Sequence, residues 1–176
     1  MSLRPILIHP DPRLKKVAEA VEAVDDDLRR LIDDMLETMY DAPGIGLAAP
    51  QIGLSRRVFV MDVAPKDGEP EPMAFVNPTI LEASAETAVY EEGCLSIPEI
   101  YEDVERPARV TMRWEDREGV VREAAFDGLA ATCAQHELDH LNGKLFIDHL
   151  SSLKRGMITQ KMKKLKRERA KPAASG

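Results

Sequence analysis

Cysteine, aromatic residues and long apolar runs are all scarce in this 176-residue sequence. Its two cysteines, Cys94 and Cys133, lie far apart and lack the dense pattern of a disulfide-stapled secreted domain. No apolar run approaches the roughly 18–20 residues of a membrane-spanning helix, and the N-terminus MSLRPILIHPDP has the features of neither a signal nor a transit peptide. With four Phe, three Tyr and one Trp, the core must be mainly aliphatic. We therefore expect a cytoplasmic protein with free thiols, neither secreted nor inserted in a membrane.

Positive charge is scarce except near the C-terminus. The chain carries 24 Lys and Arg against 31 Asp and Glu, a net charge of −7. Residues 154–171 contain nine basic residues and one acid, Glu168, so the remainder is strongly acidic. An acidic body disfavours binding of the whole protein to nucleic acid, whereas the basic segment could dock on a polyanion. The alternative is a solvated helix that balances the charge of the body.

The length suits one domain, and the expected strands and helices are segregated along the chain, which indicates an α+β fold. Asp25 is a good N-cap for a helix over 25–40, whose apolar residues share one face. The segment 44–53, GIGLAAPQIG, matches neither a regular helix nor an alternating strand. We expect small antiparallel sheets packed around a buried central helix, with further helices before and after it. Strands are predicted at 58–63, 73–76, 80–83, 88–91, 109–114 and 120–126, and helices at 128–142 and 154–169.

The strongest chemical signal is the HExxH motif formed by His136, Glu137 and His140 on the predicted central helix. At about 100° per residue, the two histidines lie about 40° apart on one helix face. That spacing lets two imidazoles bind one ion, with Glu137 beside them to transfer a proton. A chance match is the alternative, although two of only four histidines fall in the motif.

The rest of this helix is apolar on two sides, which is typical of a buried helix. Leu129, Thr132 and Cys133 share the face of the histidines, while Ala131, Ala134 and Leu138 lie opposite. Two unpaired histidines and a glutamate would be costly in such a place, so a bound cation is a natural way to satisfy them.

Two histidines are too few for a catalytic metal site, which normally uses three protein ligands and leaves one position for water. Downstream of the motif, Asp148 and His149 come soonest, and neither sits in a known metal-binding signature. Upstream, Cys94 lies between Gly93 and an extended stretch that ends at Pro98. A lone cysteine is usually a small buried hydrophobe, so these residues alone leave the third ligand open.

Three blocks carry a resemblance to a known family. They are Gly44 to Gln51 (GIGLAAPQ), Glu92 to Ser96 (EGCLS) and Gln135 to His140 (QHELDH). Together and in this order they resemble the signatures GxGLAAxQ, EGCLS and QHExDH of peptide deformylases. Such enzymes are metal-dependent hydrolases that remove the N-terminal formyl group from the formyl-methionine of newly synthesised polypeptides and release formate. The resemblance spans nearly the whole chain, and the chain then divides into a catalytic domain (1–153), a basic C-terminal helix (154–170) and a disordered tail (171–176).

The resemblance implies a role for each matching position. Cys94, His136 and His140 would hold one divalent metal, with Glu137 as the general acid and base. The implied metal in cells is Fe(II), and Zn(II), Ni(II) or Co(II) would suit the same ligands in purified protein.

The other implied residues bind the substrate, a formyl-Met peptide. The side-chain amide of Gln51 and the backbone N–H of Leu95 would face the developing oxyanion, and the backbone around Gly46 would take the peptide as an added strand. The methionine pocket would be lined by Ile45, Leu129, Thr132 and Cys133.

Three further residues are candidates for supporting roles. Some family members have a substrate-orienting arginine shortly after EGCLSIP; here that run is EIYED, and Arg106 is the candidate substitute. Glu92 and Asp139 are candidates to accept the second N–H of a ligating histidine, and ordinary surface or ion-paired acids are the alternative.

Two rival functions share some of these features. A zinc endopeptidase would use HExxH but give Cys94 no role. A ribosome- or RNA-associated adaptor with a purely structural metal would need four protein ligands, and only three candidates are present. Some family members dock such a basic helix near the ribosomal exit, so the ribosome is a candidate partner of this monomeric protein.

Overall fold

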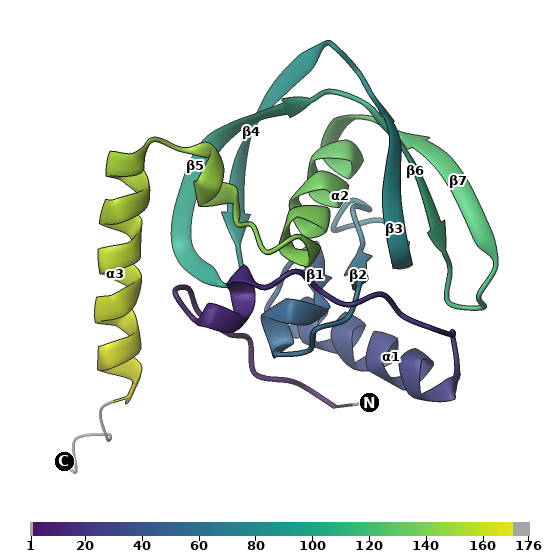
Figure 1. Ribbon diagram of the computed structural model, residues 1–176, viewed down its shortest axis with the longest axis horizontal. Coiled ribbons are helices and arrows are strands. Elements are labelled where there is room, and N and C mark those ends of the chain that lie inside the picture. The colour runs from purple at the N-terminus through teal and green to yellow at the C-terminus, as the bar shows by residue number, and fades with distance from the viewer. Residues whose placement is uncertain (1, 171–176) are drawn as a thin grey trace.

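The computed structural model describes residues 2–170, so the predicted tail 171–176 lies outside the described residues (Figure 1). It has two antiparallel sheets and three α-helices, α1 (Asp26–Asp41), α2 (Gly128–Leu141) and α3 (Ser152–Ala170). None of the helices in this range is both long and apolar enough to cross a membrane.

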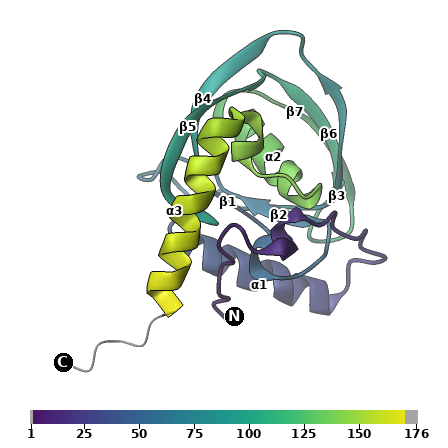
Figure 2. The ribbon, with the colours of Figure 1, turned by 60° about the vertical axis from the view of Figure 1, so that its left-hand side comes forward.

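The larger sheet has five strands in the order β1-β2-β3-β6-β7, and the smaller sheet pairs β4 with β5. Their bounds are β1 (Gly46–Ala48), β2 (Val58–Met61), β3 (Met73–Ala83), β4 (Thr87–Cys94), β5 (Ile97–Pro107), β6 (Val110–Glu115) and β7 (Val121–Phe126). The two sheets stand on either side of α2, and α1 covers the end of the molecule near β1 and β2 (Figures 1 and 2). The α+β arrangement around a central helix is therefore confirmed.

The central helix α2 is buried along most of its length, as its two apolar sides predict. Its buried residues include both histidines and Glu137, so three titratable side chains of one helix lie in the interior. Gly143, just after the helix, has φ of 75°, and a Cβ there would lie 2.5 Å from the carbonyl oxygen of Lys15. Only glycine fits this turn, which fixes where the chain leaves the helix.

Four of the eight aromatic residues, Phe59, Phe75, Trp114 and Phe126, pack together in one cluster. Phe59 and Phe75 stack with ring centroids 4.5 Å apart, and Trp114 lies 4.5 Å from Phe75. They join the inner faces of β2, β3 and β6 to the apolar side of α2. The predicted helix 25–40 is confirmed as α1, because Asp25 caps it by accepting a hydrogen bond from the N–H of Leu28 at 2.9 Å.

The predicted strands differ from the observed ones in three places. The strands expected at 73–76 and 80–83 are one strand, β3, in which Asn77 has φ of 50° and the pairing register shifts between Val76 and Thr79. Pro78 lacks an N–H for the ladder, so the sequence suggested a break where the structure has a bulge. The segment 44–53 contains the short strand β1 and a 3₁₀ helix, Ala49–Ile52. Strand β5 went unpredicted because its charged, half-exposed sequence lacks a strand's apolar content.

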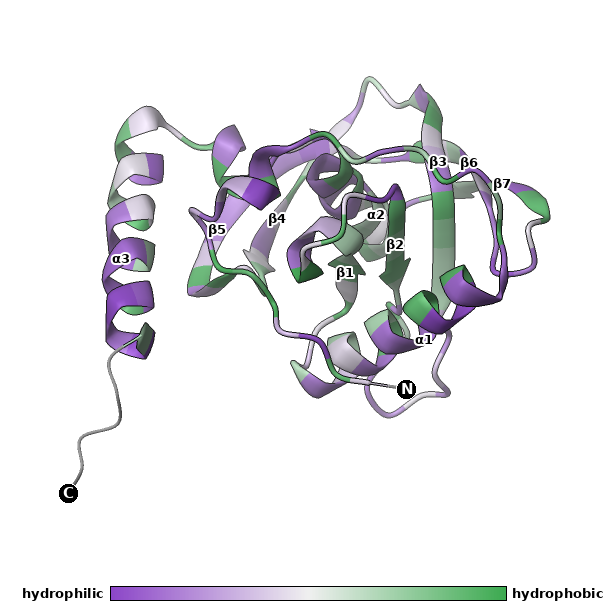
Figure 3. Cartoon of the chain, turned by 60° about the horizontal axis from the view of Figure 1, so that its bottom comes forward, coloured by the Kyte–Doolittle hydropathy of each residue, from purple (hydrophilic) through white to green (hydrophobic). Residues whose placement is uncertain are grey.

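The basic helix α3 is packed on the body by one apolar stripe. Ile158 and Met162 are buried in a cluster with Ile97 and Phe146, and the hydroxyl of Thr159 lies 2.9 Å from His9 Nε2. Most of the other residues of α3 are hydrophilic (Figure 3), although Leu153 and Met157 near its start are exposed apolar residues. A packed apolar stripe leaves the basic residues of the helix on its outer faces.

Candidate active site

The structure brings Cys94, His136 and His140 together. One ligand atom from each lies within 4.8 Å of the other two, and Cys94 Sγ is 3.4 Å from His140 Nε2. Ligands placed tetrahedrally around a divalent metal, with bonds of about 2.3 Å to sulfur and 2.0–2.1 Å to nitrogen, lie about 3.5 Å apart. One thiol and two imidazoles at this separation therefore fit such a metal.

Local chain geometry explains why the three side chains converge. The two histidines are one turn apart on α2, with ring centroids separated by 5.0 Å. Cys94 ends β4, and a register shift between Glu92 and Cys94 turns its side chain toward the helix. Glycine at position 93 lets the ring of Tyr101 pack against the backbone, because a Cβ there would lie 2.6 Å from that ring.

Glu92 orients the first histidine. Its carboxylate accepts a hydrogen bond from His136 Nδ1 at 2.9 Å, which leaves Nε2 of that ring for another partner. The same carboxylate receives two hydrogen bonds from Arg106, at 2.7 and 2.9 Å. Burial opposes ionisation of Glu92, but the hydrogen bonds from Arg106 and His136 outweigh it and lower the pKa.

Arg106 therefore does not replace a substrate-orienting arginine. Its guanidinium is 5% exposed, lies outside the cavity wall, and also donates to Asp139 at 2.8 Å. Asp139 in turn lies 2.9 Å from His149 Nε2. Asp139 and His149 are both outside the cluster of Cys94, His136 and His140. Of the two acids predicted to support a ligating histidine, Glu92 contacts His136 directly, whereas Asp139 is linked to it only through Arg106 and Glu92.

The two histidines differ in protonation. Burial lowers the pKa of His140 well below its usual value, and the nearby His136 and Arg106 lower it further, so this imidazole is neutral. Burial would lower the pKa of His136 as well, but hydrogen bonds with Cys94 and Glu92 raise it well above the usual value. A metal cation at this site therefore competes with a proton on His136.

Glu137 is buried beside the three candidate ligands. Its Oε1 lies 3.8 Å from His136 Nε2, and its Oε2 has no hydrogen-bond partner among the described residues. Burial is the main reason that the pKa of Glu137 rises from 4.5 to about 7, although His136 opposes the shift. A carboxyl group with this pKa exchanges a proton readily near neutral pH.

Gln51 is held in one orientation with its amide nitrogen at the site. Its Oε1 accepts a hydrogen bond from the N–H of Ala48 at 2.9 Å. Its Nε2 lies 3.1 Å from Ser96 Oγ and 3.5 Å from Cys94 Sγ. Ser96 is fully buried and was not singled out from the sequence, although it belongs to the EGCLS block. Its hydroxyl is what fixes the Gln51 amide.

A cavity of about 830 Å³ opens beside these groups. All the predicted substrate-binding residues line it, namely Ile45, Gly46, Leu129, Thr132 and Cys133. The wall also includes Gln51, Leu95, Glu137, Cys94 and His136. His140 lies behind the wall and is fully buried. Cys133 is outside the candidate ligand cluster, and burial raises the pKa of its thiol, which donates to the carbonyl oxygen of Ile45 at 3.8 Å.

Gly46 brings a strand edge against Glu137. A Cβ at this position would lie 2.9 Å from Glu137 Cδ and 3.0 Å from Cys133 Sγ. Strand β1 is an edge strand, paired with β2 only, and the carbonyl of Ile45 already accepts from Asp62 on the β2 side. Because such bonds alternate along a strand, the N–H and C=O of Gly46 face the free edge, where an extended peptide can pair.

The comparisons with known proteins agree with this geometry. A family model described as polypeptide deformylase matches residues 3–156. A peptide deformylase from Mesorhizobium japonicum is 56% identical over 170 residues, and the match covers 97% of each chain. A peptide deformylase from Phenylobacterium zucineum is 60% identical over 164 residues, and the match covers 93% of this chain and 97% of the relative. The crystal structure of a peptide deformylase from Legionella pneumophila has a TM-score of 0.89 at 48% identity, covering 97% of this chain and 100% of that one.

The chain belongs to the peptide deformylase family. It is therefore an enzyme, a hydrolase of a family that removes N-terminal formyl groups. The three sequence blocks of this family form separate parts of one site. The first supplies edge strand β1 and Gln51, the second supplies Glu92 and Cys94, and the third supplies the face of α2 that meets them.

Replacing Gly46 with alanine should slow deformylation without unfolding the protein. The added methyl group would displace the Glu137 carboxyl, and loss of a well-placed acid–base group costs about 100-fold or more in rate. The measurement is kcat/KM for formate release from a formyl-Met peptide. Gly156→Ala is the matched control, because a Cβ there meets nothing within 4 Å; a Gly46→Ala enzyme as active as this control would contradict the prediction.

Glu137 should also make the metal-free protein less stable as pH rises. The folded-state pKa of about 7 exceeds the unfolded value of 4.5, so stability is full below pH 4.5 and is lost as pH rises through 7. In chelator-treated protein, Glu137→Gln should leave the free energy of unfolding nearly unchanged at about pH 4.5, and raise it by about 3 kcal/mol at about pH 8. Denaturant titration at the two pH values checks this, and an equal effect at both would refute it.

Proposed function

We propose that this chain is a metal-dependent peptide deformylase that removes the formyl group from the formyl-methionine of newly synthesised polypeptides and releases formate. The observation that carries the proposal is the placement of Glu137, Gln51 and the Cys94–His136–His140 cluster around one end of a single cavity. Membership of the family indicates the reaction, and these side chains are the groups that would carry it out.

Cys94, His136 and His140 would hold the metal. When bound, it supplies Lewis acidity, which polarises the formyl carbonyl and makes water easier to deprotonate. The chemistry of the donors fits this role, because His140 is already neutral and Glu92 fixes the tautomer of His136 through Nδ1.

Glu137 transfers the proton. Its carboxylate takes a proton from the attacking water and later donates it to the nitrogen of the departing amine, so that the C–N bond breaks and formate leaves. A pKa of about 7 suits both directions of this transfer near neutral pH. Burial keeps the carboxyl away from bulk water, so the proton passes between the reacting groups.

The formyl oxygen needs hydrogen-bond donors fixed in advance. The Gln51 amide is held by Ala48 and Ser96, and we propose that it and the N–H of Leu95 stabilise the negative charge on that oxygen. One such donor is typically worth about 3–4 kcal/mol of transition-state stabilisation. Gly46, Cys133 and Glu137 approach one another closely, and we propose that this narrow part of the site admits a formyl carbon, which bears only hydrogen, and disfavours an acetyl group.

The test is anaerobic formate release from a formyl-Met tripeptide, with bound metal measured on the same samples. Wild-type protein should be active, Glu137→Ala should lose about 100-fold or more in kcat while keeping its metal, and the acetyl-Met analogue should be a poor substrate. Cys94→Ala should lose both metal and activity, whereas Cys133→Ala should keep its metal.

The same series separates the proposal from a zinc endopeptidase. A peptidase would keep its metal in Cys94→Ala and would cleave internal peptide bonds. Comparable turnover of formyl-Met and acetyl-Met peptides would contradict the steric account of the site.

We further propose Fe(II) as the metal in cells. One thiolate and two imidazoles also suit Zn(II), Co(II) and Ni(II). The Fe(II) enzyme should lose activity in air or peroxide, because both the iron and the Cys94 sulfur can be oxidised, and Ni(II) or Co(II) should restore activity to the metal-free protein. A fully active zinc enzyme that is stable in air would contradict this assignment.

We also propose that the basic face of α3 docks on ribosomal RNA near the exit of the nascent chain. Support comes from the exposed lysines of this helix, which remain outside because its apolar stripe is packed on the body. Removing the whole helix would uncover the apolar residues of the body that Ile158 and Met162 cover, among them Ile97 and Phe146, so substitution of surface lysines is the cleaner test.

Lys161→Ala/Lys164→Ala should weaken ribosome binding, and wild-type binding should fall steeply with added salt. Lys66→Ala, in an exposed turn away from α3, is the control. Unchanged ribosome affinity of the double variant in a sedimentation assay would count against docking through α3.

A further inference from the structure

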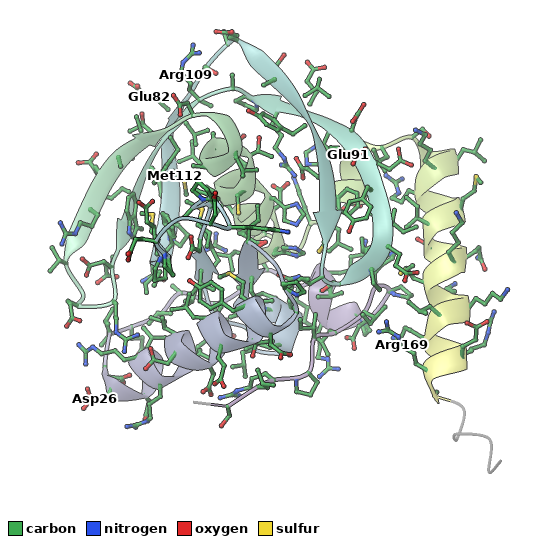
Figure 4. The ribbon with its side chains drawn as sticks, turned by 180° about the vertical axis from the view of Figure 1, so that it is seen from behind. Asp26, Glu82, Glu91, Arg109, Met112 and Arg169 are labelled. Atoms are coloured by element: carbon green, nitrogen blue, oxygen red, sulfur yellow. The ribbon has the colours of Figure 1, made fainter. Side chains whose placement is uncertain are left out.

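Arg169 lies where the packing pattern of α3 calls for an apolar residue. Ile158, Met162 and Leu165 form the stripe that packs on the body, with spacings of four and three residues. The next position of this pattern is Arg169, four residues after Leu165, so it lies on the same face of the helix. Figure 4, in which Arg169 is labelled, shows it near the end of α3 on the side that faces the rest of the molecule.

Arg169 lines the same cavity as Cys94 and Glu137. Two other residues of the cavity wall, Ile8 and Ile100, belong to the apolar cluster that Leu165 joins. The terminal helix therefore contributes to the wall at the side formed by the N-terminal segment and β5. The proposed methionine pocket lies elsewhere on the wall, between α2 and Ile45. A cavity of about 830 Å³ therefore has room for substrate residues that follow the methionine.

Two arginines line this wall, Arg4 and Arg169. Among the residues that the structure describes, Arg169 has no hydrogen-bond or ion-pair partner. The other one, Arg4, donates to Asp34 at 2.9 and 3.2 Å. The wall also carries the exposed acids Asp41, Glu91 and Glu99, which repel a substrate carboxylate. Arg169 is therefore the position on this wall where a substrate carboxylate can bind favourably.

We propose that Arg169 binds a carboxylate of the peptide substrate, downstream of the formyl-methionine, and gives the enzyme a preference for acidic peptides. A guanidinium pairs with a carboxylate through two parallel hydrogen bonds, which gives orientation as well as charge recognition. In a nascent chain the carboxylate is an Asp or Glu side chain, whereas in a short free peptide it can also be the C-terminus. This inference rests on the proposed deformylase function, and Arg169 is a specificity-determining residue with no part in bond cleavage.

The test compares matched peptides that differ in one carboxylate. Formyl-Met-Ala-Ser with a free C-terminus is compared with its amide, and formyl-Met-Ala-Asp-amide with formyl-Met-Ala-Asn-amide. Wild-type enzyme should favour the carboxylate peptide by about three- to fivefold in kcat/KM, the range expected of an exposed ion pair. The difference should lie in KM and not in kcat, because the contact is the same in ground and transition states. A preference in the first pair alone identifies the C-terminal carboxylate as the ligand, and one in the second pair identifies the side chain.

Variants of Arg169 separate this role from general charge effects. Arg169→Ala should abolish the preference, Arg169→Glu should reverse it, and Arg169→Lys should keep part of it because the charge remains but the paired hydrogen bonds do not. Arg167→Ala, an exposed arginine two residues away that does not line the cavity, should behave as wild type. Raising the salt to about 0.5 M should reduce the wild-type preference.

Equal kcat/KM for all matched peptides in the wild type, or a preference that survives Arg169→Ala, would overturn the proposal. Failure of the proposed function looks different, since no peptide would then release formate. The dissociation constants of the same peptides for Glu137→Gln, measured by calorimetry with and without Arg169→Ala, test the carboxylate contact without catalysis. The carboxylate peptides should bind about three- to fivefold more tightly, and only when Arg169 is present.

Discussion

The structure depends on compensating the titratable groups that α2 carries into the interior. Two imidazoles and a carboxyl group on one buried helix would each be costly without partners. The Glu92 carboxylate compensates one imidazole directly, and Arg106 neutralises that carboxylate while linking it to Asp139 on the same helix. Replacing Glu92 or Arg106 alone would leave its partner buried and uncompensated, so these residues must be understood as one unit.

This unit also explains how distant segments form one site. The ion pair joins β4, which carries Cys94, to β5 and to α2, which carries the histidines. On the other side of the cavity, glycine at position 46 brings an edge strand close to Glu137. The sulfur, the acid–base group and the free strand edge are therefore positioned by contacts within the body and do not depend on a mobile loop.

Much of this site could be predicted from the sequence, because the relevant patterns are local or belong to a family. The HExxH spacing placed two histidines on one helix face, and the EGCLS block supplied the cysteine. The role of Arg106 could not be predicted, because a charged residue on a strand looks the same in sequence whether it faces solvent or a buried carboxylate. The role of Ser96 could not be predicted either, because it depends on a tertiary contact with Gln51. The bulge at Asn77 and the strand Gly46–Ala48 were missed for a similar reason, since tertiary pairing decided them against local propensity. The division into a catalytic domain and a basic helix stays a prediction.

X-ray absorption spectroscopy of the metal-loaded protein tests the central claim most directly, because it reports which atoms bind the metal. The account predicts one sulfur scatterer at about 2.3 Å and two imidazole nitrogens at about 2.0–2.1 Å, supplied by Cys94, His136 and His140. A spectrum with nitrogen and oxygen scatterers alone would contradict it, since Cys94 would then have no place in the metal site.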